Sequence, residues 1–449
     1  MTTTALVYGM AISGEAVARA LHARGTRVLV ADDSPSEAKV AAADAVGADL
    51  IVRPDDESLE FLVAASDIVC PAPGVPETHR VIAAAIRRAK PICTEIDLAY
   101  QWEQERGGGA RPMLAVTGTD GKTTTTMMAA AMLQCAGLKA AAVGNTETPL
   151  IAALDSDVDA FVVECSSFRL NWIEHFRSEA SVWLNLAPDH QNWHVSMEAY
   201  EQSKARMWRH NRAGDVAIGC ATDPIVMRNL AVAAGRRCTF DGPTADYRLD
   251  GSLLVSPHGP ITERSAMTRD LPHDVSNALA AAAISIESGL ATTTAVAEAL
   301  TTFEHPPHRI EPIGEFDGAR WYNDSKATTP HAAITAIRGF DRVVLLAGGR
   351  NKGLDLAGLA DEHDRVKAVV ALGEAAPIVR DAFARWCEVV AAASMGDAVA
   401  AAARLASPGD TVLLSPACAS FDWYPDGGYP ARGEDFKRLV HAYFQGAGR

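Results

Sequence analysis

The sequence has no run of five or more basic residues, no Cys-x-x-Cys pair and no apolar segment long enough to span a bilayer. Its net charge of −15 argues against a nucleic-acid partner, because polyanions bind clusters of lysine and arginine. The eight cysteines lie mostly in apolar runs, which is typical of reduced thiols in the cytosol. The first residues, Met-Thr-Thr-Thr, lack the basic segment of a secretion signal. We therefore expect a cytoplasmic protein without membrane insertion.

A glycine-rich turn lies between an apolar run at 113–117 and a helix-favouring segment that continues to residue 132. The turn reads Gly118-Thr-Asp-Gly-Lys-Thr-Thr124. Backbone N–H groups at such a turn and the helix dipole attract an anion, Lys122 adds a positive charge, and the Thr123 hydroxyl can bind Mg²⁺. The spacing is two residues shorter than that of the common phosphate loop. We predict a nucleoside triphosphate site here, and an ordinary strand-to-helix turn is the alternative.

The first hundred residues have the outline of a nucleotide-binding fold. A strand at 5–9 leads through a turn to a helix at 15–24, and a second strand ends in Asp32 and Asp33. The turn lacks the middle glycine of Gly-x-Gly-x-x-Gly, so we expect a nucleotide or nucleotide sugar rather than a redox dinucleotide. A Pro/Gly loop at 71–76 is placed to close the same pocket. Plain turn chemistry is the alternative for these polar residues.

Polar residues also follow the predicted strands of the central region. Glu164 ends one strand, while Asn185, Asp189 and His190 follow the next. The carboxyl ends of parallel strands lie at one edge of a sheet, where ligands bind. Oxygen ligands and a histidine beside a triphosphate suit Mg²⁺, although each residue alone is more typical of a cap or a satisfied polar group. Lys204 lies in a predicted helix at 196–210 among aromatic residues, where the simplest interpretation is a snorkelling surface lysine.

The last third of the chain repeats the α/β pattern. A predicted hairpin at 310–322 is followed by a polar loop and by strands at 343–347, 366–372 and 411–414, with helices between them. Polar loops follow the first and the last of these strands, again where a ligand would bind. Linker-like composition at 103–112 and 304–309 marks the candidate boundaries. We predict an α/β protein of three domains, at residues 1–97, 98–306 and 307–449.

Together these motifs resemble the Mur ligases, the ATP-dependent amide-forming enzymes of peptidoglycan synthesis. The resemblance covers the whole chain. The phosphate loop is common to the family, whereas Glu-x-Ser-Ser-Phe, Asp-Ser-Lys-Ala-Thr and Ser-Pro-Ala-Cys-Ala-Ser resemble the branch that adds D-glutamate. The residues that carry the resemblance are Gly118–Thr124, Glu164–Phe168, Asn185–His190, Lys204, Asn277, His308–Arg309, Asn323–Thr328 and Ser415–Ser420.

The resemblance implies a Rossmann-like, UDP-binding N-terminal domain, a central P-loop-type ATPase domain and a Rossmann-like C-terminal domain that binds glutamate. It further implies that ATP phosphorylates the carboxylate of UDP-N-acetylmuramoyl-L-alanine and that the amine of D-glutamate displaces the phosphate, with acyl phosphate as the intermediate. ATP and Mg²⁺, the latter at two sites, are the implied cofactors. We expect a monomer.

The resemblance also assigns roles to individual residues. Catalytic roles fall to Lys122, His190, Lys204 and Lys326. ATP is expected at Gly118, Thr119, Asp120, Gly121, Lys122, Thr123, Thr124, Asn277, Arg309 and Asp324. The metal ligands are expected to be Thr123, Glu164, His190 and Lys204, the last as a carbamate formed with CO₂. The UDP-substrate is expected at Ile12, Ser13, Asp32, Asp33, Ala72, Pro73, Gly74 and Asn145, and glutamate at Lys326, Thr328, Lys352, Ser415 and Phe421.

Four residues depart from the family pattern. Asp120 and Asp274 stand in place of asparagines, Glu147 in place of a glycine and Arg169 in place of a glutamine. We hypothesise that Arg169 balances the charge of Glu147 or Asp120. Two alternatives within the enzyme class are ligation of L-glutamate and another Mur-type ligation, although the Asp-Asn-Pro-Arg motif of diaminopimelate ligases is missing. A non-catalytic nucleotide-binding protein is the alternative from another class.

Overall fold

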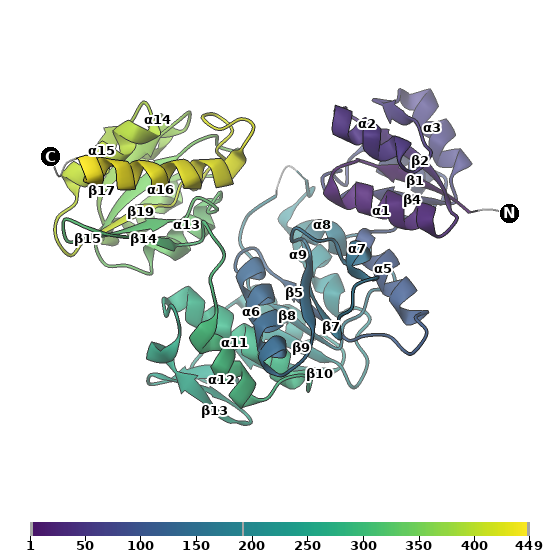
Figure 1. Ribbon diagram of the computed structural model, residues 1–449, viewed down its shortest axis with the longest axis horizontal. Coiled ribbons are helices and arrows are strands. Elements are labelled where there is room, and N and C mark those ends of the chain that lie inside the picture. The colour runs from purple at the N-terminus through teal and green to yellow at the C-terminus, as the bar shows by residue number, and fades with distance from the viewer. Residues whose placement is uncertain (1–2, 191–192, 447–449) are drawn as a thin grey trace. The chain divides into compact units, whose positions relative to one another are not determined.

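The computed structural model describes residues 3–190 and 193–446. The chain divides into two compact units, which we describe separately. The first comprises Met1–Thr268 and Val275–Phe303, and the second comprises Arg269–Asp274 and Glu304–Arg449. Parallel sheets with intervening helices build both units, which confirms the predicted α/β class (Figure 1). The further division of the first unit at residue 97 stays a prediction.

The N-terminal sheet is parallel and has the order β3-β2-β1-β4, the order in which a Rossmann sheet begins. The chain reverses its direction of winding between β1 and β4, so the loops after these two strands meet. A Cβ on Gly9, whose φ is +94°, would lie 2.9 Å from the Cβ of Ala72, so glycine is required for this approach. The elements are β1 (Thr4–Tyr8), α1 (Ile12–Ala23), β2 (Arg27–Asp32), α2 (Glu37–Asp44), β3 (Leu50–Val52), α3 (Asp56–Ala65), β4 (Ile68–Pro71), α4 (Arg80–Arg87) and α5 (Glu95–Gln104).

The second sheet of the first unit has six parallel strands in the order β10-β9-β8-β5-β7-β6. Its winding reverses around β5, which places the loops after β5, β7 and β8 at one edge. The elements are β5 (Met113–Thr117), α6 (Lys122–Cys135), β6 (Ala140–Gly144), α7 (Leu150–Ala153), β7 (Ala160–Glu164), α8 (Ser167–Leu170), β8 (Ala180–Trp183), α9 (Met197–Ala205), η1 (Arg206–Trp208), β9 (Val216–Cys220), α10 (Pro224–Leu230) and β10 (Arg236–Phe240).

A small antiparallel sheet and two helices complete this unit. The sheet has the order β11-β12-β13, and helix α12 packs against both β13 and α6. The helix α11 carries a nearly continuous run of buried alanines from Ala278 to Ala283, which lets it lie close to its neighbours. The elements are β11 (Arg248–Asp250), β12 (Leu253–Ser256), β13 (Gly259–Glu263), η2 (Arg264–Ala266), α11 (Pro272–Glu287) and α12 (Thr293–Thr302).

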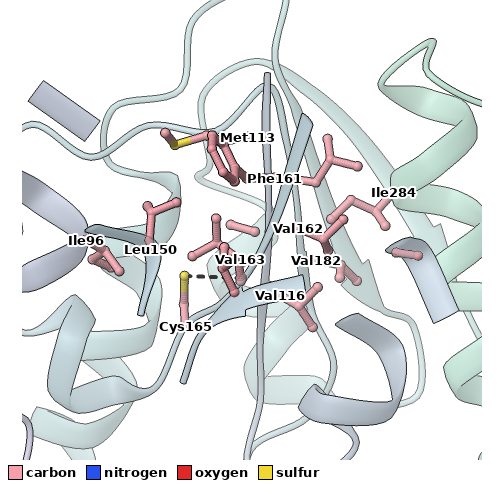
Figure 2. Packing of buried hydrophobic residues seen from close by; sticks show 14 of the residues in the cluster. Ile96, Met113, Val116, Leu150, Phe161, Val162, Val163, Cys165, Val182 and Ile284 are labelled. Carbon is pink, nitrogen blue, oxygen red and sulfur yellow. Dashed lines mark hydrogen bonds between the residues drawn. The ribbon is translucent and has the colours of Figure 1, made fainter. Parts of the chain in front are cut away.

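Strand β7 lies between β5 and β6 and contributes to the largest hydrophobic cluster of the first unit. Its residues Phe161, Val162 and Val163 are consecutive, apolar and fully buried, as expected for a parallel strand that is covered on both faces. Figure 2 shows them packed between Leu150 and Ile96 on one side and Ile284 on the other. This packing fixes the position of Glu164, which ends the strand.

The second unit contains one six-stranded sheet in the order β14-β15-β19-β16-β17-β18. The predicted hairpin is confirmed as the antiparallel pair β14 and β15, and all other pairs are parallel. The strands β18-β17-β16-β19 repeat the order of the N-terminal sheet, so the loops after β16 and β19 meet at a reversal of winding. The elements are β14 (Glu311–Phe316), β15 (Ala319–Asn323), α13 (Pro330–Ile337), β16 (Val343–Gly348), η3 (Ala357–Arg365), β17 (Val366–Leu372), α14 (Ala376–Phe383), β18 (Glu388–Ala391), α15 (Met395–Leu405), β19 (Thr411–Leu414) and α16 (Gly428–Gly446).

No helix within residues 3–190 and 193–446 combines the length and the hydropathy that a membrane crossing requires.

Candidate nucleotide and metal site

The glycine-rich turn joins β5 to α6 in the predicted strand–turn–helix order. Gly121 caps α6 with a φ of +82°, and a Cβ there would lie 2.5 Å from Oδ1 of Asn277. A Cβ on Gly118 would lie 2.9 Å from the Cβ of Leu184. Both positions therefore require glycine, and the start of the 14-residue helix α6 provides N–H groups for an anion. Thr123 and Thr124 lie in its first turn, and Asn277, a predicted ATP residue on α11, lies beside the loop.

Asn185 fixes the shape of this loop. Its Oδ1 accepts hydrogen bonds from the backbone N–H groups of Thr119 and Asp120, both at 2.9 Å, and its Nδ2 donates to the carbonyl of Asp120. These bonds use both lone pairs of Oδ1. Asn185 therefore shapes the loop, and its oxygen is not available to a metal ion, contrary to the interpretation from its place at a strand end. The hydroxyls of Tyr200 and Thr119 lie 3.1 Å apart and tie helix α9 to the same loop.

Two lysines converge on the carbonyls of this loop. Lys122 Nζ donates to the carbonyls of Gly118 and Thr119 at 2.9 and 2.6 Å, and Lys204 Nζ donates to the carbonyl of Gly118 at 2.7 Å. Lys204 is 1% exposed, so the interpretation as a snorkelling surface lysine is wrong. Burial, aided by the charge of Lys122, holds the pKa of Lys204 well below its usual value, although Asp189 and Asp120 oppose the shift. The environment therefore favours the neutral amine.

Glu164 presents a carboxylate oxygen that has no hydrogen-bond partner among the residues that the structure describes. Its Oε1 accepts from Asn145 Nδ2 at 2.9 Å, while its Oε2 is buried without a hydrogen bond. Leaving a buried carboxylate oxygen unpaired is unfavourable, so Glu164 fits a cation as its missing partner. Within the described residues no three His, Cys, Asp or Glu side chains surround a common point. A metal ion here would therefore need ligands of other types, and Thr123 and Lys204 are the predicted ones.

His190 lies at the edge of the same region, with its backbone in the left-handed conformation at a φ of 55°. Its Nε2 lies 3.2 Å from Oδ2 of Asp189, and Asp189 Oδ1 accepts from the backbone N–H of His190 at 2.7 Å. The imidazole packs edge-on against Phe168, with 4.6 Å between the ring centres. Phe168 in turn contacts Trp193, so an aromatic cluster orients the predicted histidine ligand.

Seven of the eight residues predicted for the UDP-substrate lie at or shortly after the ends of β1, β2 and β4, whereas Asn145 follows β6. The carboxylate of Asp32 holds these loops together, because it accepts hydrogen bonds from the backbone N–H groups of Met10 and Ser34 and from Lys39. Burial alone would raise the pKa of Asp32, but these hydrogen bonds lower it below its usual value. Ile12, which is 66% exposed, Gly74 and Asn145 are accessible, and Asp33 is half-buried with its carboxylate in contact with Tyr8 and His79.

Arg169 joins two of the predicted residues to an acid that the sequence did not single out. Its guanidinium donates to Ser13 Oγ at 2.7 Å, to Asn145 Oδ1 at 2.5 Å and to Glu95 Oε2 at 3.3 Å. The carboxylate that pairs with Arg169 is thus Glu95, so the hypothesis of a pairing with Glu147 or Asp120 is wrong. Glu95 stands at the start of a polar-looking helix, and no local pattern predicts its burial.

In the second unit, Asp324 and Ser415 form a buried pair at the ends of β15 and β19. Ser415 Oγ donates to Asp324 Oδ2 at 2.7 Å. The hydroxyl proton of Ser415 is therefore bound to Asp324, whereas we expected this hydroxyl to donate to glutamate. Burial raises the pKa of Asp324 to about 7, while Ser415 and the charge of Arg309 oppose the shift. Lys326 Nζ lies 5.1 Å above the ring of Tyr429. Thr328 is half-buried, and Lys352 and Phe421 are exposed.

Arg432 of helix α16 is a buried residue that the sequence analysis missed. Its Nε donates to Ser325 Oγ at 2.9 Å, and its Nη2 donates to the carbonyls of Ser325 and Cys418 at 2.8 and 3.1 Å. It therefore binds together the two loops that carry the predicted glutamate residues. Its signal in the sequence is weak because arginines on a surface helix are common.

Asp274 has a structural explanation. Its carboxylate pairs with Arg269 at 2.6 and 2.7 Å, and Arg269 also donates to the carbonyls of Arg309 and Ile310. The acid thus holds an arginine that fixes the backbone just before β14. An asparagine could not supply this charge.

Comparison with known proteins identifies the family. Residues 116–285 match the Mur ligase middle domain, and residues 308–418 match the Mur ligase glutamate ligase domain. The chain belongs to the Mur ligase family. The predictions of the family and of a ligase are thus confirmed. A protein of Frankia casuarinae named UDP-N-acetylmuramoylalanine–D-glutamate ligase is 42% identical, over 97% of this chain and 93% of that protein. Proteins with the same name from Thermobifida fusca and Streptomyces avermitilis are 37% and 36% identical, each over 97% of both chains.

Solved structures support the fold of this Mur ligase. The UDP-N-acetylmuramate–alanine ligase of Thermotoga maritima superposes with a TM-score of 0.61 at 17% identity, over 99% of this chain and 100% of that one. The MurF protein of Acinetobacter baumannii gives 0.60 at 15% identity, over 97% and 91%. At these identities the likeness concerns the fold alone.

Proposed function

We propose that this Mur ligase joins D-glutamate to UDP-N-acetylmuramoyl-L-alanine, with cleavage of ATP to ADP and phosphate. The names of the similar proteins and the match to a glutamate ligase domain support this substrate pair. The observation that carries the proposal is Lys204, a buried lysine whose Nζ lies 2.7 Å from the carbonyl of Gly118 in the phosphate loop. A protein that only bound nucleotide would not need a second, desolvated amine at this place.

In this proposal the neutral amine of Lys204 attacks CO₂. A bond forms between Nζ and the carbon, one amine proton leaves, and a carbamate anion results. A lowered pKa favours this reaction, because only the unprotonated amine has the electron pair that it needs. A buried ammonium group without a paired carboxylate is electrostatically unfavourable. The carbamate would replace this positive charge with an anion whose oxygens can bind a metal cation.

Glu164, Thr123, His190 and the modified Lys204 would hold Mg²⁺ at two sites. The unpaired Oε2 of Glu164 and the hydroxyl at the start of α6 support this ligand set. When bound, Mg²⁺ would neutralise the charge that accumulates on the transferred phosphoryl group. Lys122 and the N–H groups of the loop would add to this stabilisation from the protein side.

The chemistry would proceed in two steps. The substrate carboxylate attacks the γ-phosphorus of ATP, and ADP leaves with the electrons of the broken P–O bond. The amine of glutamate then attacks the acyl carbon through a tetrahedral intermediate, phosphate leaves, and the amine loses a proton. We assign glutamate to the loops after β15, β16 and β19 of the second unit, where Lys326 and Lys352 would pair with its carboxylates.

Phosphate release tests the proposal most directly. The enzyme is supplied with ATP, Mg²⁺ and UDP-N-acetylmuramoyl-L-alanine, and D-glutamate, L-glutamate and other amino acids are compared. We expect release that depends on D-glutamate and on the UDP-substrate together. Absence of release with every amino acid would contradict the ligase proposal for this substrate, and release with L-glutamate alone would reassign the amino acid. Because the substrates are ATP and a soluble nucleotide precursor, we also propose a cytoplasmic location, and the monomeric state stays a prediction.

A further inference from the structure

Four side chains form a continuous hydrogen-bonded chain between the first strand–helix turn of the N-terminal sheet and the predicted metal carboxylate. Ser13 Oγ and Asn145 Oδ1 both accept from Arg169, and Asn145 Nδ2 donates to Glu164 Oε1. Arg169 is 4% exposed and Glu164 is 2% exposed, whereas Ser13 is half-buried and Asn145 is exposed, so the exposed Asn145 amide is held between two buried partners. The chain thus runs from the predicted UDP-substrate loop to the predicted metal site inside the first unit.

The chemistry of arginine determines the orientation of Asn145. A guanidinium can only donate, so the atom of Asn145 that faces Arg169 must be the carbonyl oxygen. The amide nitrogen is then turned toward Glu164, where it donates to Oε1. As a result Oε1 is occupied and Oε2 is the one oxygen of Glu164 that is left buried without a hydrogen bond. The direction of this oxygen therefore depends on Arg169, which does not touch it.

Glu95 holds the guanidinium in place. It is 4% exposed, and its Oε1 accepts from the backbone N–H of Ile151 at 2.7 Å while its Oε2 accepts from Arg169. Glu95 stands on α5 and Ile151 on α7, two helices whose residues Ile96 and Leu150 are packed in the core (Figure 2). The guanidinium is thus held by a carboxylate whose helix packs in the hydrophobic core.

We propose that Arg169 is a positioning residue, which orients the Asn145 amide so that Glu164 presents one unpaired oxygen to a divalent cation. The proposal rests on the proposed function for the identity of the metal site, but its test does not require ligase turnover. Groups that orient a metal ligand commonly affect the affinity of the metal by about tenfold or more. The contact with Ser13 places the same guanidinium at the UDP-substrate loop.

Removing Arg169 alone would leave Glu95 buried without its partner, which endangers folding. We therefore compare two double variants of nearly equal size, Glu95→Gln/Arg169→Gln and Glu95→Gln/Arg169→Met. Glutamine retains a donor for Asn145 Oδ1, whereas methionine has none. The single variant Glu95→Gln, which retains the arginine, is the control for the loss of the buried acid.

The readout is the binding of Mn²⁺, a paramagnetic divalent cation, followed by electron paramagnetic resonance with the full-length protein. We expect the Arg169→Met double variant to bind Mn²⁺ about tenfold more weakly than Glu95→Gln, and the Arg169→Gln double variant to recover most of this loss. A thermal melt of each variant checks its folding. Equal Mn²⁺ affinity of the two folded double variants and Glu95→Gln would overturn the proposal, whether or not the wild type ligates glutamate. If the methionine variant does not fold, weakened binding in Asn145→Leu decides the same question, since this variant lacks the amide that Arg169 orients.

Discussion

Lys204 in the first unit and Arg432 in the second are both buried beside the loops of a candidate site, and their hydrogen-bond partners differ greatly in number. Lys204 is 1% exposed; among the described residues it donates to one carbonyl, that of Gly118, and its Nζ lies 4.6 Å from the centre of the Tyr200 ring. Arg432 in the second unit is 2% exposed and donates to three acceptors on two loops. Burial lowers both pKa values, to about 10 for Arg432 and well below the usual value for Lys204.

The difference separates two uses of a buried cation. A guanidinium that meets several acceptors stays charged and ties chain segments together, because each hydrogen bond to a charged group is strong in a buried environment. An amine with one acceptor and a neighbouring positive charge is favoured in its neutral, nucleophilic form. We therefore expect Lys204 to contribute to chemistry and Arg432 to contribute to stability.

The largest effect should follow the change Lys204→Met. We expect the rate of phosphate release to fall by about 10³-fold or more, since a metal ligand is lost. The melting temperature should stay the same or rise, because a desolvated amine is replaced by an apolar side chain of similar length. Steady-state kinetics and a thermal melt of the same sample check both parts.

The smaller variant Lys204→Ala provides the control for the carbamate. It should be equally inactive but recover part of its activity with added formate or acetate, which can occupy the place of the carbamate. A Lys204→Met enzyme that loses stability but keeps near wild-type activity would reverse the comparison between the two cations.

The variant Arg432→Met should show the opposite pattern. It leaves the carbonyls of Ser325 and Cys418 without their donor, and we expect a loss of about 3 kcal/mol in the free energy of unfolding. The KM for glutamate should rise, whereas the KM for ATP should change little. Denaturant unfolding and kinetics measure these quantities. Exposed Arg438 of the same helix offers a matched control, and Arg438→Met should have little effect.

The features that could be predicted from the sequence are those that depend on residues close together in the chain. Strand–turn–helix patterns located the sheets, and the spacing of Gly118, Gly121 and Lys122 predicted the phosphate loop, because a tight turn and a helix start depend on neighbouring residues. The structure places the predicted Asn277 beside that loop, although it is more than 150 positions away in the sequence.

What could not be predicted depends on contacts between distant residues. The burial of Lys204 results from the packing of α9 on the loop, and its own helix reads as an ordinary surface helix of low hydropathy. The partner of Arg169 is Glu95, 74 positions earlier, and charge alone did not distinguish it from Glu147 or Asp120. Asn185 was grouped with the metal ligands because its place at a strand end does not reveal which way its oxygen points.

The smallest predicted effect is a change in the pH dependence of stability, and it concerns two buried aspartates of the second unit. The pKa of Asp324 is raised to about 7 by burial, so above its usual value of 3.8 the folded state holds a proton that the unfolded state has lost. Its contribution is therefore present at acidic pH and is lost as the pH rises through about 7. The free-energy difference between Asp324→Asn and the wild type should shift in favour of the variant by about 2 kcal/mol from about pH 5 to about pH 7.5, as measured by denaturant unfolding.

The pKa of Asp410, in the same unit, is shifted in the opposite direction from that of Asp324. Burial alone would raise its pKa, but Lys367 at 2.6 Å and Arg342 at 2.8 Å, together with the N–H of Ser407, hold it below the usual value. Its stabilising contribution is present above pH 4 and is lost as the pH falls through the lowered pKa. The variant Asp410→Asn should thus be less stable than the wild type at neutral pH, and this deficit should shrink under strongly acidic conditions. If both asparagine variants showed the same pH dependence, the number of charged partners would not decide whether a buried group keeps its charge, and the contrast between Lys204 and Arg432 would lose its physical basis.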